Sequence, residues 1–386
     1  MTSKGTIDSA TGLQDKSKMG AKPAQELRVL IVGHDPKLPG GIANYVRCLS
    51  GYLTQQPNVV VSFLNENEIK RNANVHHQSI PVKLAAARRM IAAIQSAIDQ
   101  HRPNVVHLQA AYGYSVTEKA ILAWVAKSRG VPAIVHMHGS SFERELETMP
   151  ASRRAWLSQA LSKPNHVVVL SGKLQKLLAE KFPFAGNTAI PTSVEATAQP
   201  YPLSTAPLVV GFIGLLNGRK GENDLINAFA RIKDTEATLV IAGDGDNKAT
   251  AEKLAADLGL SARVRFLGNV SGMVKEQFFR DINILCLPSH AENMPAALLE
   301  AMSHGRPVIG SRIGAIPEMI DIKNDGWLVD VGDVDAIAQA IDDAASNPDD
   351  LRRRGAFAWT KANEKYTWDV NGPRYLALYA QVSGIK

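Results

Sequence analysis

Residues 289–311, SHAENMPAALLEAMSHGRPVIGS, decide the fold of this chain. The apolar run INILCL at residues 282–287 precedes them and predicts a buried strand, while residues 296–304 show a helical pattern. Gly305 is a good helix stop, and the apolar run at residues 307–309 predicts a second strand. Strand, loop, helix and strand in this order predict one unit of a parallel sheet in an α/β protein.

Two glutamates of this stretch point to a ligand. Glu292 follows the predicted strand on a loop, and Glu300 lies about one turn into the helix. The helix directs its free N–H groups at that loop, and Pro295 fits an early helical position because its missing N–H costs nothing there. A helix end and two carboxylates together suit an anion that carries neighbouring hydroxyls. This is the chemistry of a nucleotide sugar.

The Glu-x7-Glu spacing, followed by LLEAM and GRPVIGS, resembles the retaining glycosyltransferases of family four. The resemblance extends over about residues 27–382 and is most specific at residues 282–318. It implies the GT-B fold, in which two Rossmann-like doubly wound domains face a central cleft. It also implies transfer of a sugar from a nucleoside diphosphate sugar to an acceptor, with retention of the anomeric configuration.

Apolar runs alternate with helical patterns along both halves of the chain, as in the helical stretches 83–100 and 116–129. This alternation predicts parallel sheets covered on both faces, with a linker rich in Pro, Ser and Thr near residues 195–207. The predicted strands are residues 28–33, 58–64, 105–108, 133–137, 166–170, 209–214, 237–242, 264–267, 282–287 and 308–310.

The alternation and the resemblance together give the expected organisation. Residues 1–26 are polar and should form a disordered tail, without the apolar core of a signal peptide. Residues 27–195 should form an acceptor-side domain, and residues 208–365 a nucleotide-sugar-binding domain. In the family, the terminal helix, here within residues 366–386, returns to the first domain.

Charge and cysteine content bound the class of protein. The 386 residues carry a net charge of +6, which divides into +10 for residues 1–205 and −4 for residues 206–386. No apolar run reaches the ~18 residues of a membrane helix. Cys48 and Cys286 lie in apolar contexts and should be reduced thiols, which is typical of a cytoplasmic protein.

The basic half suggests an anionic partner, such as the inner face of the cytoplasmic membrane or a phosphorylated lipid. Residues 83–100 combine Arg88 and Arg89 with Ile91, Ile94 and Ile98 at helical spacing. This pattern suits peripheral membrane binding, and equally a core-packed helix with solvated arginines. No recognisable nucleic-acid motif is present, so no nucleic acid partner is expected.

The second half opens with a strand that ends at Gly214, followed by a loop that carries Arg219, Lys220 and Gly221. Adjacent cations can neutralise a diphosphate and stabilise it as a leaving group. Lys220 and Gly221 match the family pattern, whereas Leu215 occupies the position of the family's arginine. We therefore expect Arg219 to take over that role.

The first half supplies two further motifs. Gly40 and Gly41 precede a predicted helix, do not form a dinucleotide fingerprint, and match the family's Gly-Gly loop near the donor diphosphate. His138 precedes Gly139 at a strand end and matches a position where the imidazole contacts the donor sugar and helps stabilise developing charge. His136 should pack within the strand. No third ligand for a metal is evident beside these histidines.

The resemblance assigns the remaining donor contacts. Leu267 and Gly268 match the position that holds the base, and Glu300 would hold the ribose hydroxyls. Glu292, with the backbone amides of Asn293 and Met294, would hold the sugar hydroxyls. No convincing Asp-x-Asp motif appears, so we expect a metal-independent enzyme without a cofactor, in which protein cations stabilise the leaving group.

The predicted activity is hexosyl transfer from a UDP- or GDP-linked sugar to a saccharide or lipid-linked acceptor, in cell-surface polysaccharide or exopolysaccharide biosynthesis. Two alternatives remain open: a sugar-nucleotide 2-epimerase of the same fold, and a catalytically silent subunit that recruits a partner to the membrane. The retained Arg219, Lys220, Glu292 and Glu300 argue against a silent subunit.

Overall fold

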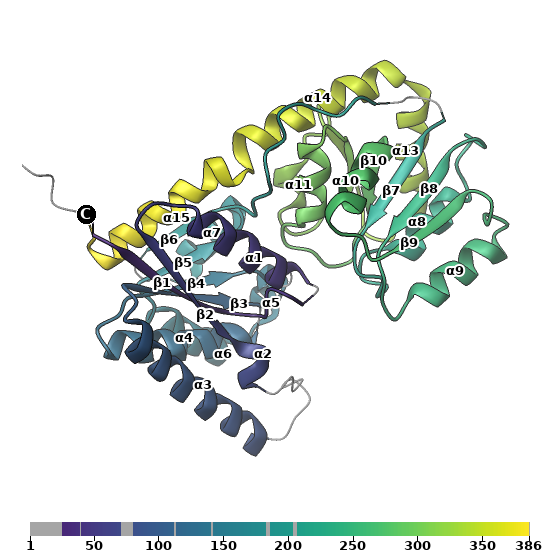
Figure 1. Cartoon of the computed structure of the whole chain (residues 1–386). Coiled ribbons are helices and arrows are strands. Elements are labelled where there is room, and N and C mark those ends of the chain that lie inside the picture. Colours follow the sequence, from purple (N-terminus) through teal and green to yellow (C-terminus); the bar gives the residue numbers. More distant parts are fainter. Residues whose placement is uncertain are drawn as a thin grey trace, which may run out of the picture.

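The computed structural model describes residues 25–38, 40–70, 80–111, 113–139, 142–182, 186–203 and 207–385 (Figure 1). The predicted disordered tail therefore lies outside the described residues, apart from residues 25 and 26. Within these ranges the chain forms two α/β domains, each built on one parallel six-stranded sheet.

The N-terminal domain is built on a sheet whose strands run in the order β2-β1-β3-β4-β5-β6. The chain therefore reverses direction across the sheet between β1 and β3, the point at which ligands of such sheets bind. The strands are β1 (Leu27–Gly33), β2 (Val59–Asn65), β3 (Val105–Ala110), β4 (Ala133–Met137), β5 (His166–Val169) and β6 (Asn187–Ala189).

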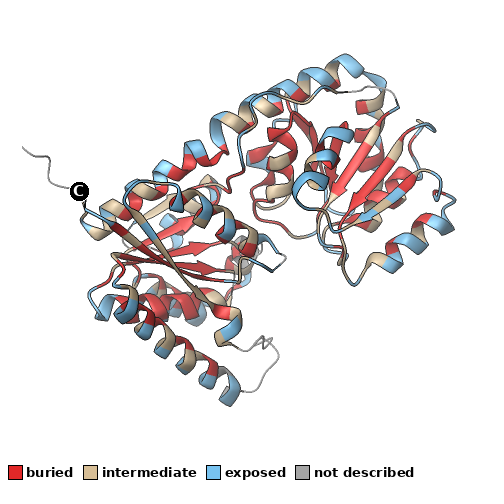
Figure 2. Ribbon diagram, viewed as in Figure 1, coloured by how far each residue is buried: buried red, intermediate tan, exposed pale blue. Residues whose placement is uncertain are grey.

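Helices cover both faces of this sheet, which is why its strands are apolar on both sides (Figure 2). The helices are α1 (Gly41–Thr54), α2 (Glu66–Ile69), α3 (Ile80–His101), α4 (Tyr114–Ser128), α5 (Phe142–Thr148), α6 (Ala151–Leu161) and α7 (Gly172–Lys181). Val106 packs with the core under α3 and α4, whereas its neighbour Val105 packs on the opposite face, with α1.

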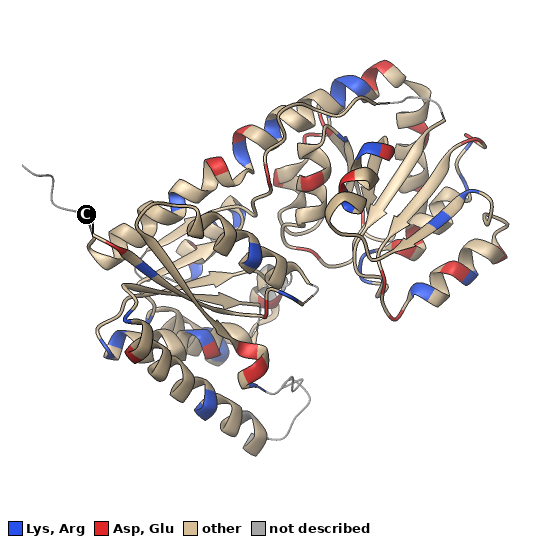
Figure 3. Cartoon of the chain, in the orientation of Figure 1, with Lys and Arg blue, Asp and Glu red and all other residues tan. Residues whose placement is uncertain are grey.

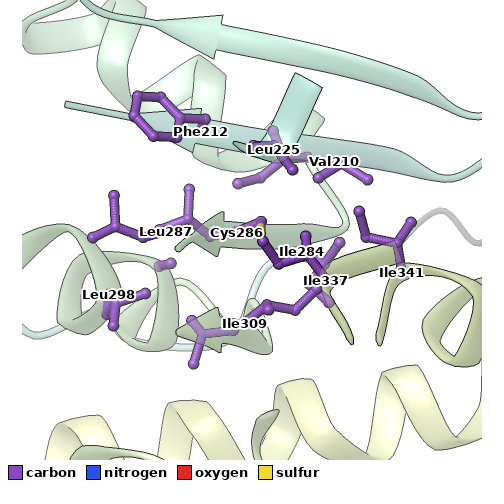
Figure 4. Close-up of a cluster of buried hydrophobic side chains, with 14 of the residues drawn as sticks. Val210, Phe212, Leu225, Ile284, Cys286, Leu287, Leu298, Ile309, Ile337 and Ile341 are labelled. Atoms are coloured by element: carbon purple, nitrogen blue, oxygen red, sulfur yellow. The ribbon is translucent and has the colours of Figure 1, made fainter. Parts of the chain in front are cut away.

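The C-terminal domain is built on a second parallel sheet, in the order β12-β11-β10-β7-β8-β9. This is the Rossmann strand order, with the reversal between β7 and β10. Figure 4 shows part of its core, where Val210, Ile284 and Ile341 meet. The strands are β7 (Val209–Ile213), β8 (Thr238–Ala242), β9 (Val264–Gly268), β10 (Ile284–Leu287), β11 (Val308–Ser311) and β12 (Gly326–Val329).

The chain crosses between the domains twice, through the linker near residue 194 and through the junction of the last two helices. The two crossings are hydrogen-bonded: Val194 N donates to Tyr366 O at 2.8 Å, and Trp368 N donates to Val194 O at 3.1 Å. The helices of this half are α8 (Glu222–Phe229), α9 (Lys248–Asp257), α10 (Gly272–Asp281), α11 (Ala296–Ser303), α12 (Ile316–Met319), α13 (Val334–Ser346), α14 (Pro348–Lys365) and α15 (Trp368–Ser383).

Helix α15 belongs to the core of the N-terminal domain. Tyr375 and Tyr379 are buried there, and the hydroxyl of Tyr379 lies 2.7 Å from His107 Nδ1 on β3. The free thiol Cys286 is buried in the C-terminal core, while Cys48 is partly exposed on α1.

The predicted fold class is confirmed, and all ten predicted strands are present. The sequence missed β6 and β12, which are short edge strands. β6 is only three residues of mixed polarity, and β12 has only three apolar residues, after a glycine and before Asp330. Pro295 differs slightly from expectation: it precedes α11 as its N-cap, with extended ψ, instead of lying in the first turn.

Candidate active site

A cleft of about 660 Å³ lies between the two domains. Its walls are the loops that follow the carboxyl ends of β1, β3, β4 and β5 on one side, and of β7, β8, β9 and β10 on the other. Both strand-order reversals therefore open into the same space, and this is where a ligand of doubly wound domains is expected.

The loop between β7 and α8 carries the two predicted cations, Arg219 and Lys220, and both line the cleft. Glu222 lies completely buried behind this loop, where its carboxylate accepts from Gly218 N at 2.6 Å and from Asn247 Nδ2 at 2.8 Å. A buried carboxylate with two donors fixes the backbone that presents the cations. The loop is thus preorganised.

Gly221 allows this loop to approach the next one. Its φ is +77°, and a Cβ at this position would lie 2.1 Å from Pro288 O. His290 N donates to Arg219 O at 2.8 Å across the same approach. The loops after β7 and β10 therefore form one continuous wall, and only glycine fits at this contact.

The loop after β10 and helix α11 present the two glutamates to the cleft. Glu292 is nearly buried and pairs with Lys220, while Glu300 accepts from Lys275 Nζ of α10 at 2.7 Å. Each carboxylate therefore has a lysine beside it. Gly314, at φ +52°, packs behind the loop, where a Cβ would lie 2.3 Å from Glu292 O.

The N-terminal wall carries Gly40, Gly41 and His138. Gly40 has a φ of +132°, a conformation that favours glycine, and it stands directly before α1. His138 Nε2 lies 2.7 Å from Gln109 Oε1, so with that oxygen as acceptor the ring proton is on Nε2. Burial, and then the neighbouring His107 and His34, lower the pKa of His138 to about 3. His138 is therefore a neutral imidazole at neutral pH.

The two walls touch within the cleft. Asn293 Nδ2 donates to His138 O at 3.3 Å, and Thr192 Oγ1 at the start of the linker donates to Met294 O at 3.1 Å. The loop that carries Glu292 is therefore anchored to the opposite domain through two adjacent residues, Asn293 and Met294.

The structure brings nine of the predicted site residues into this cleft: Gly40, Gly41, His138, Arg219, Lys220, Glu292, Asn293, Met294 and Glu300. Leu267 and Gly268 do not line it, and the next residues, Asn269 and Val270, do. The strand register shifts beside Leu267, which leaves it unpaired with β8. The cleft wall is therefore formed by the residues that directly follow β9.

Sequence reasoning missed Lys275 and Arg47, which also line the cleft. Lys275 lies in the first turn of α10, and nothing in the sequence indicated that this turn faces Glu300. Leu215, at the family's arginine position, lines the cleft and is exposed. No group of three or more potential metal ligands occurs among the described residues.

Two family models match the chain over nearly its whole folded length. The model of the glycosyl transferase 4-like domain matches residues 27–192. The model of glycosyl transferases group 1 matches residues 193–358. The chain belongs to the group 1, family-four-like glycosyltransferases. Its homologues in this family include retaining enzymes with the GT-B fold.

Individual relatives and solved structures are similar to parts of the chain or to nearly all of it. It is 30% identical to N-acetyl-alpha-D-glucosaminyl L-malate synthase of Bacillus anthracis over 47% of this chain, and spans about half (48%) of that relative's length. Sucrose-phosphate synthase from Thermosynechococcus elongatus superposes with a TM-score of 0.76, over 94% of this chain and 100% of that one, at 18% identity. Anabaena Alr3699/HepE, solved in complex with UDP and glucose, superposes with a TM-score of 0.70. The superposition covers 92% of this chain and 100% of that one, at 18% sequence identity. At this identity the structures support the fold alone.

Proposed function

We propose that this glycosyltransferase moves a hexosyl residue from a nucleoside diphosphate sugar to a saccharide or lipid-linked acceptor, with retention and without a metal ion. The observation that carries the proposal is the convergence of Arg219, Lys220, Glu292 and Glu300 on one cleft wall. Cations beside paired carboxylates, at the start of a helix, complement a diphosphate flanked by ribose and sugar hydroxyls.

Each side chain then has a role set by its place. The diphosphate lies against Arg219 and Lys220, which stabilise the charge that grows as the sugar–phosphate bond breaks and the diphosphate leaves with the electron pair. Glu300 accepts hydrogen bonds from the ribose hydroxyls. Glu292 and the backbone of Asn293 and Met294 hold the sugar hydroxyls.

The lysine partners of the glutamates fit this scheme. Lys220 pairs with Glu292, and Lys275 pairs with Glu300, so each carboxylate is oriented before the donor arrives. The neutral His138 offers polar contact to the sugar but adds no positive charge. The negative charge that grows on the leaving diphosphate in the transition state is therefore stabilised by Arg219 and Lys220.

The proposal is tested by donor hydrolysis with purified protein. UDP-glucose, UDP-N-acetylglucosamine, GDP-mannose and ADP-glucose are supplied in turn, and free sugar is followed by NMR, which also reports its anomer. We propose UDP-glucose as the first candidate because the similar Anabaena protein was solved with UDP and glucose. If an α-linked donor first releases the α-anomer of the free sugar, that result supports retention of the anomeric configuration.

Two controls accompany this measurement. Hydrolysis should persist in excess EDTA, and loss that magnesium or manganese restores would contradict metal independence. Release of an epimerised sugar nucleotide, in place of free sugar, would favour the 2-epimerase. Binding without turnover of any donor, even with added saccharide and lipid-linked acceptors, would favour the silent subunit.

We further propose that the N-terminal domain works at an anionic membrane surface in polysaccharide assembly. In α3, Ile94 and Ile98 pack into the core, so that face of the helix cannot meet lipid. The outer side instead exposes Leu84 and Arg88, and Figure 3 shows the Lys and Arg residues of the chain, those of α3 included, in blue. Among the described residues, no helix is long and apolar enough to cross a membrane.

A further inference from the structure

A second cavity, of about 180 Å³, lies in the N-terminal domain between the start of α4 and the helices α5 and α6. Its lining is mainly apolar and aromatic, with one acidic and one basic side chain. The residues are Gly113, Tyr114, Thr117, Phe142, Glu145, Met149, Arg153, Trp156 and Leu157. None of them lines the interdomain cleft.

This side cavity borders the cleft. Ala111 lines the cleft and Gly113, two residues later, lines the side cavity; Gly139 lines the cleft and Phe142, three residues later, lines the side cavity. Even a fully extended chain covers only about 7 Å in two residues and about 11 Å in three. The side cavity therefore lies about one or two sugar rings from the acceptor side of the cleft.

The side chains of the cavity divide into an apolar and a polar set. Tyr114 and Trp156 are 42% and 48% exposed, which is unusual for large aromatic residues, while Phe142 is buried in the core of the domain. Glu145 pairs with Arg153. The other carboxylate oxygen of Glu145, Oε2, is buried and has no hydrogen-bond donor among the described residues.

We propose that this side cavity binds one pyranose ring of a neutral saccharide acceptor, beyond the ring that is glycosylated; the assignment rests on the proposed glycosyl transfer. A pyranose has apolar C–H faces that pack on aromatic rings, and hydroxyls at its edge. Trp156 and Tyr114 supply the rings, the carboxylate of Glu145 accepts from one hydroxyl, and Arg153 donates to another.

The size and charge of the cavity favour this ligand over two others. Pockets for drug-sized ligands measure roughly 300–1,000 Å³, so 180 Å³ suits a single ring. A phosphate would face the carboxylate of Glu145 as well as Arg153, and would be repelled by it. An acyl chain would bury the Glu145–Arg153 pair without offering any hydrogen bond, which is costly.

The test is saturation-transfer NMR on the full chain with maltose, cellobiose, lactose, sodium octanoate and inorganic phosphate as probes. At least one disaccharide should show saturation transfer, and Trp156→Ala and Glu145→Gln should each reduce it at least tenfold. Trp124→Ala, on the exposed side of α4 and outside the cavity, should leave both saturation transfer and donor hydrolysis unchanged.

Three results would overturn the assignment: no transfer to any disaccharide, disaccharide transfer that both cavity variants retain, or variant-sensitive transfer to octanoate or phosphate alone. Donor hydrolysis by the unaltered protein is measured in parallel. Its absence would count against the glycosyl transfer, whereas the NMR result reports the side cavity separately. Circular dichroism of each variant establishes that the fold is intact.

Discussion

Glu318 of the C-terminal domain accepts hydrogen bonds from Gly172 N and Lys173 N of the N-terminal domain, each at 3.0 Å. These are the first residues of α7, whose N-cap Ser171 also accepts from Leu174 N at 3.1 Å. The amino end of a helix carries partial positive charge, so a carboxylate there is favourable. One helix end is thus capped from both domains. This contact favours the arrangement of the two domains seen in the structure, in which they enclose the cleft.

Removing this contact should open the cleft. Glu318→Ala should increase the radius of gyration measured by small-angle scattering, because charged hydrogen bonds are worth roughly 1.5–3 kcal/mol and less where solvent screens them. Glu252→Ala, an exposed change on α9, is the matched control. Identical scattering from both variants would show that Glu318 does not govern closure.

Nucleotide binding should depend on Glu300 and, through it, on Lys275. Glu300→Ala should weaken UDP or GDP binding by roughly 1.5–3 kcal/mol, because the ribose hydroxyls lose a charged acceptor. Lys275→Ala should weaken it less, since Lys275 orients Glu300 at 2.7 Å. Calorimetry measures both, with Lys253→Ala of α9 as a surface control. Unchanged affinity in the Glu300 variant would remove it from the donor site.

Lys220 should affect turnover more than binding. Charge on the leaving diphosphate increases in the transition state, so Lys220→Ala should lower kcat for donor turnover by more than it raises KM. Because Lys220 also pairs with Glu292, Lys220→Arg is the informative companion: it retains the charge and should recover part of kcat. A change confined to KM would assign Lys220 to ground-state binding.

Acid should destabilise the N-terminal domain through its buried histidines. Burial lowers the pKa of His107 to about 3 and that of His136 well below its usual range, whereas an unfolded histidine titrates near ~6.5. Below about pH 6.5 the unfolded chain therefore binds protons that the folded chain does not. Stability is lost as the pH falls, by about 1.4 kcal/mol per pH unit for each such histidine.

The His136→Phe variant measures how much His136 alone contributes to this pH dependence of stability. His136 stacks between His107 and His138, with ring centroids 5.4 and 4.1 Å away, and neither of its nitrogens has a hydrogen-bond partner among the described residues. Between pH 6 and 4.5, the variant's unfolding free energy in urea should fall by about 1.4 kcal/mol less per pH unit than that of the unaltered chain. Equal slopes would mean that His136 does not stay neutral.

Vesicle binding should depend on the outer side of α3. Arg88 is exposed, whereas Arg89 donates to Ile69 O at 3.2 Å, so Arg88→Glu is the cleaner change. Each cation near an anionic surface contributes about 1 kcal/mol, and salt should weaken the attraction. Co-sedimentation with anionic vesicles should therefore drop in Arg88→Glu and persist in Lys253→Glu. Equal sedimentation with neutral vesicles would favour a soluble acceptor.

The sequence predicted those parts of the site whose positions depend on residues close together along the chain. Glu292 and Glu300 lie eight residues apart in one strand–loop–helix unit, so their common wall follows from local periodicity. Lys275 comes from another helix, and its pairing with Glu300 arises only when α10 packs beside α11. Likewise, Asn269 lines the cleft in place of Leu267, and the pairing irregularity beside Leu267 depends on the neighbouring strand.

The placement of α15 has a consequence for how the chain folds. Trp368, Tyr375, Leu378 and Tyr379 complete one face of the N-terminal core, although the other buried residues of that cluster come before residue 195. During synthesis, the first domain to leave the ribosome is thus the last to receive all of its buried side chains. That face of the domain therefore stays uncovered until α15, which follows the second domain along the chain, has been made.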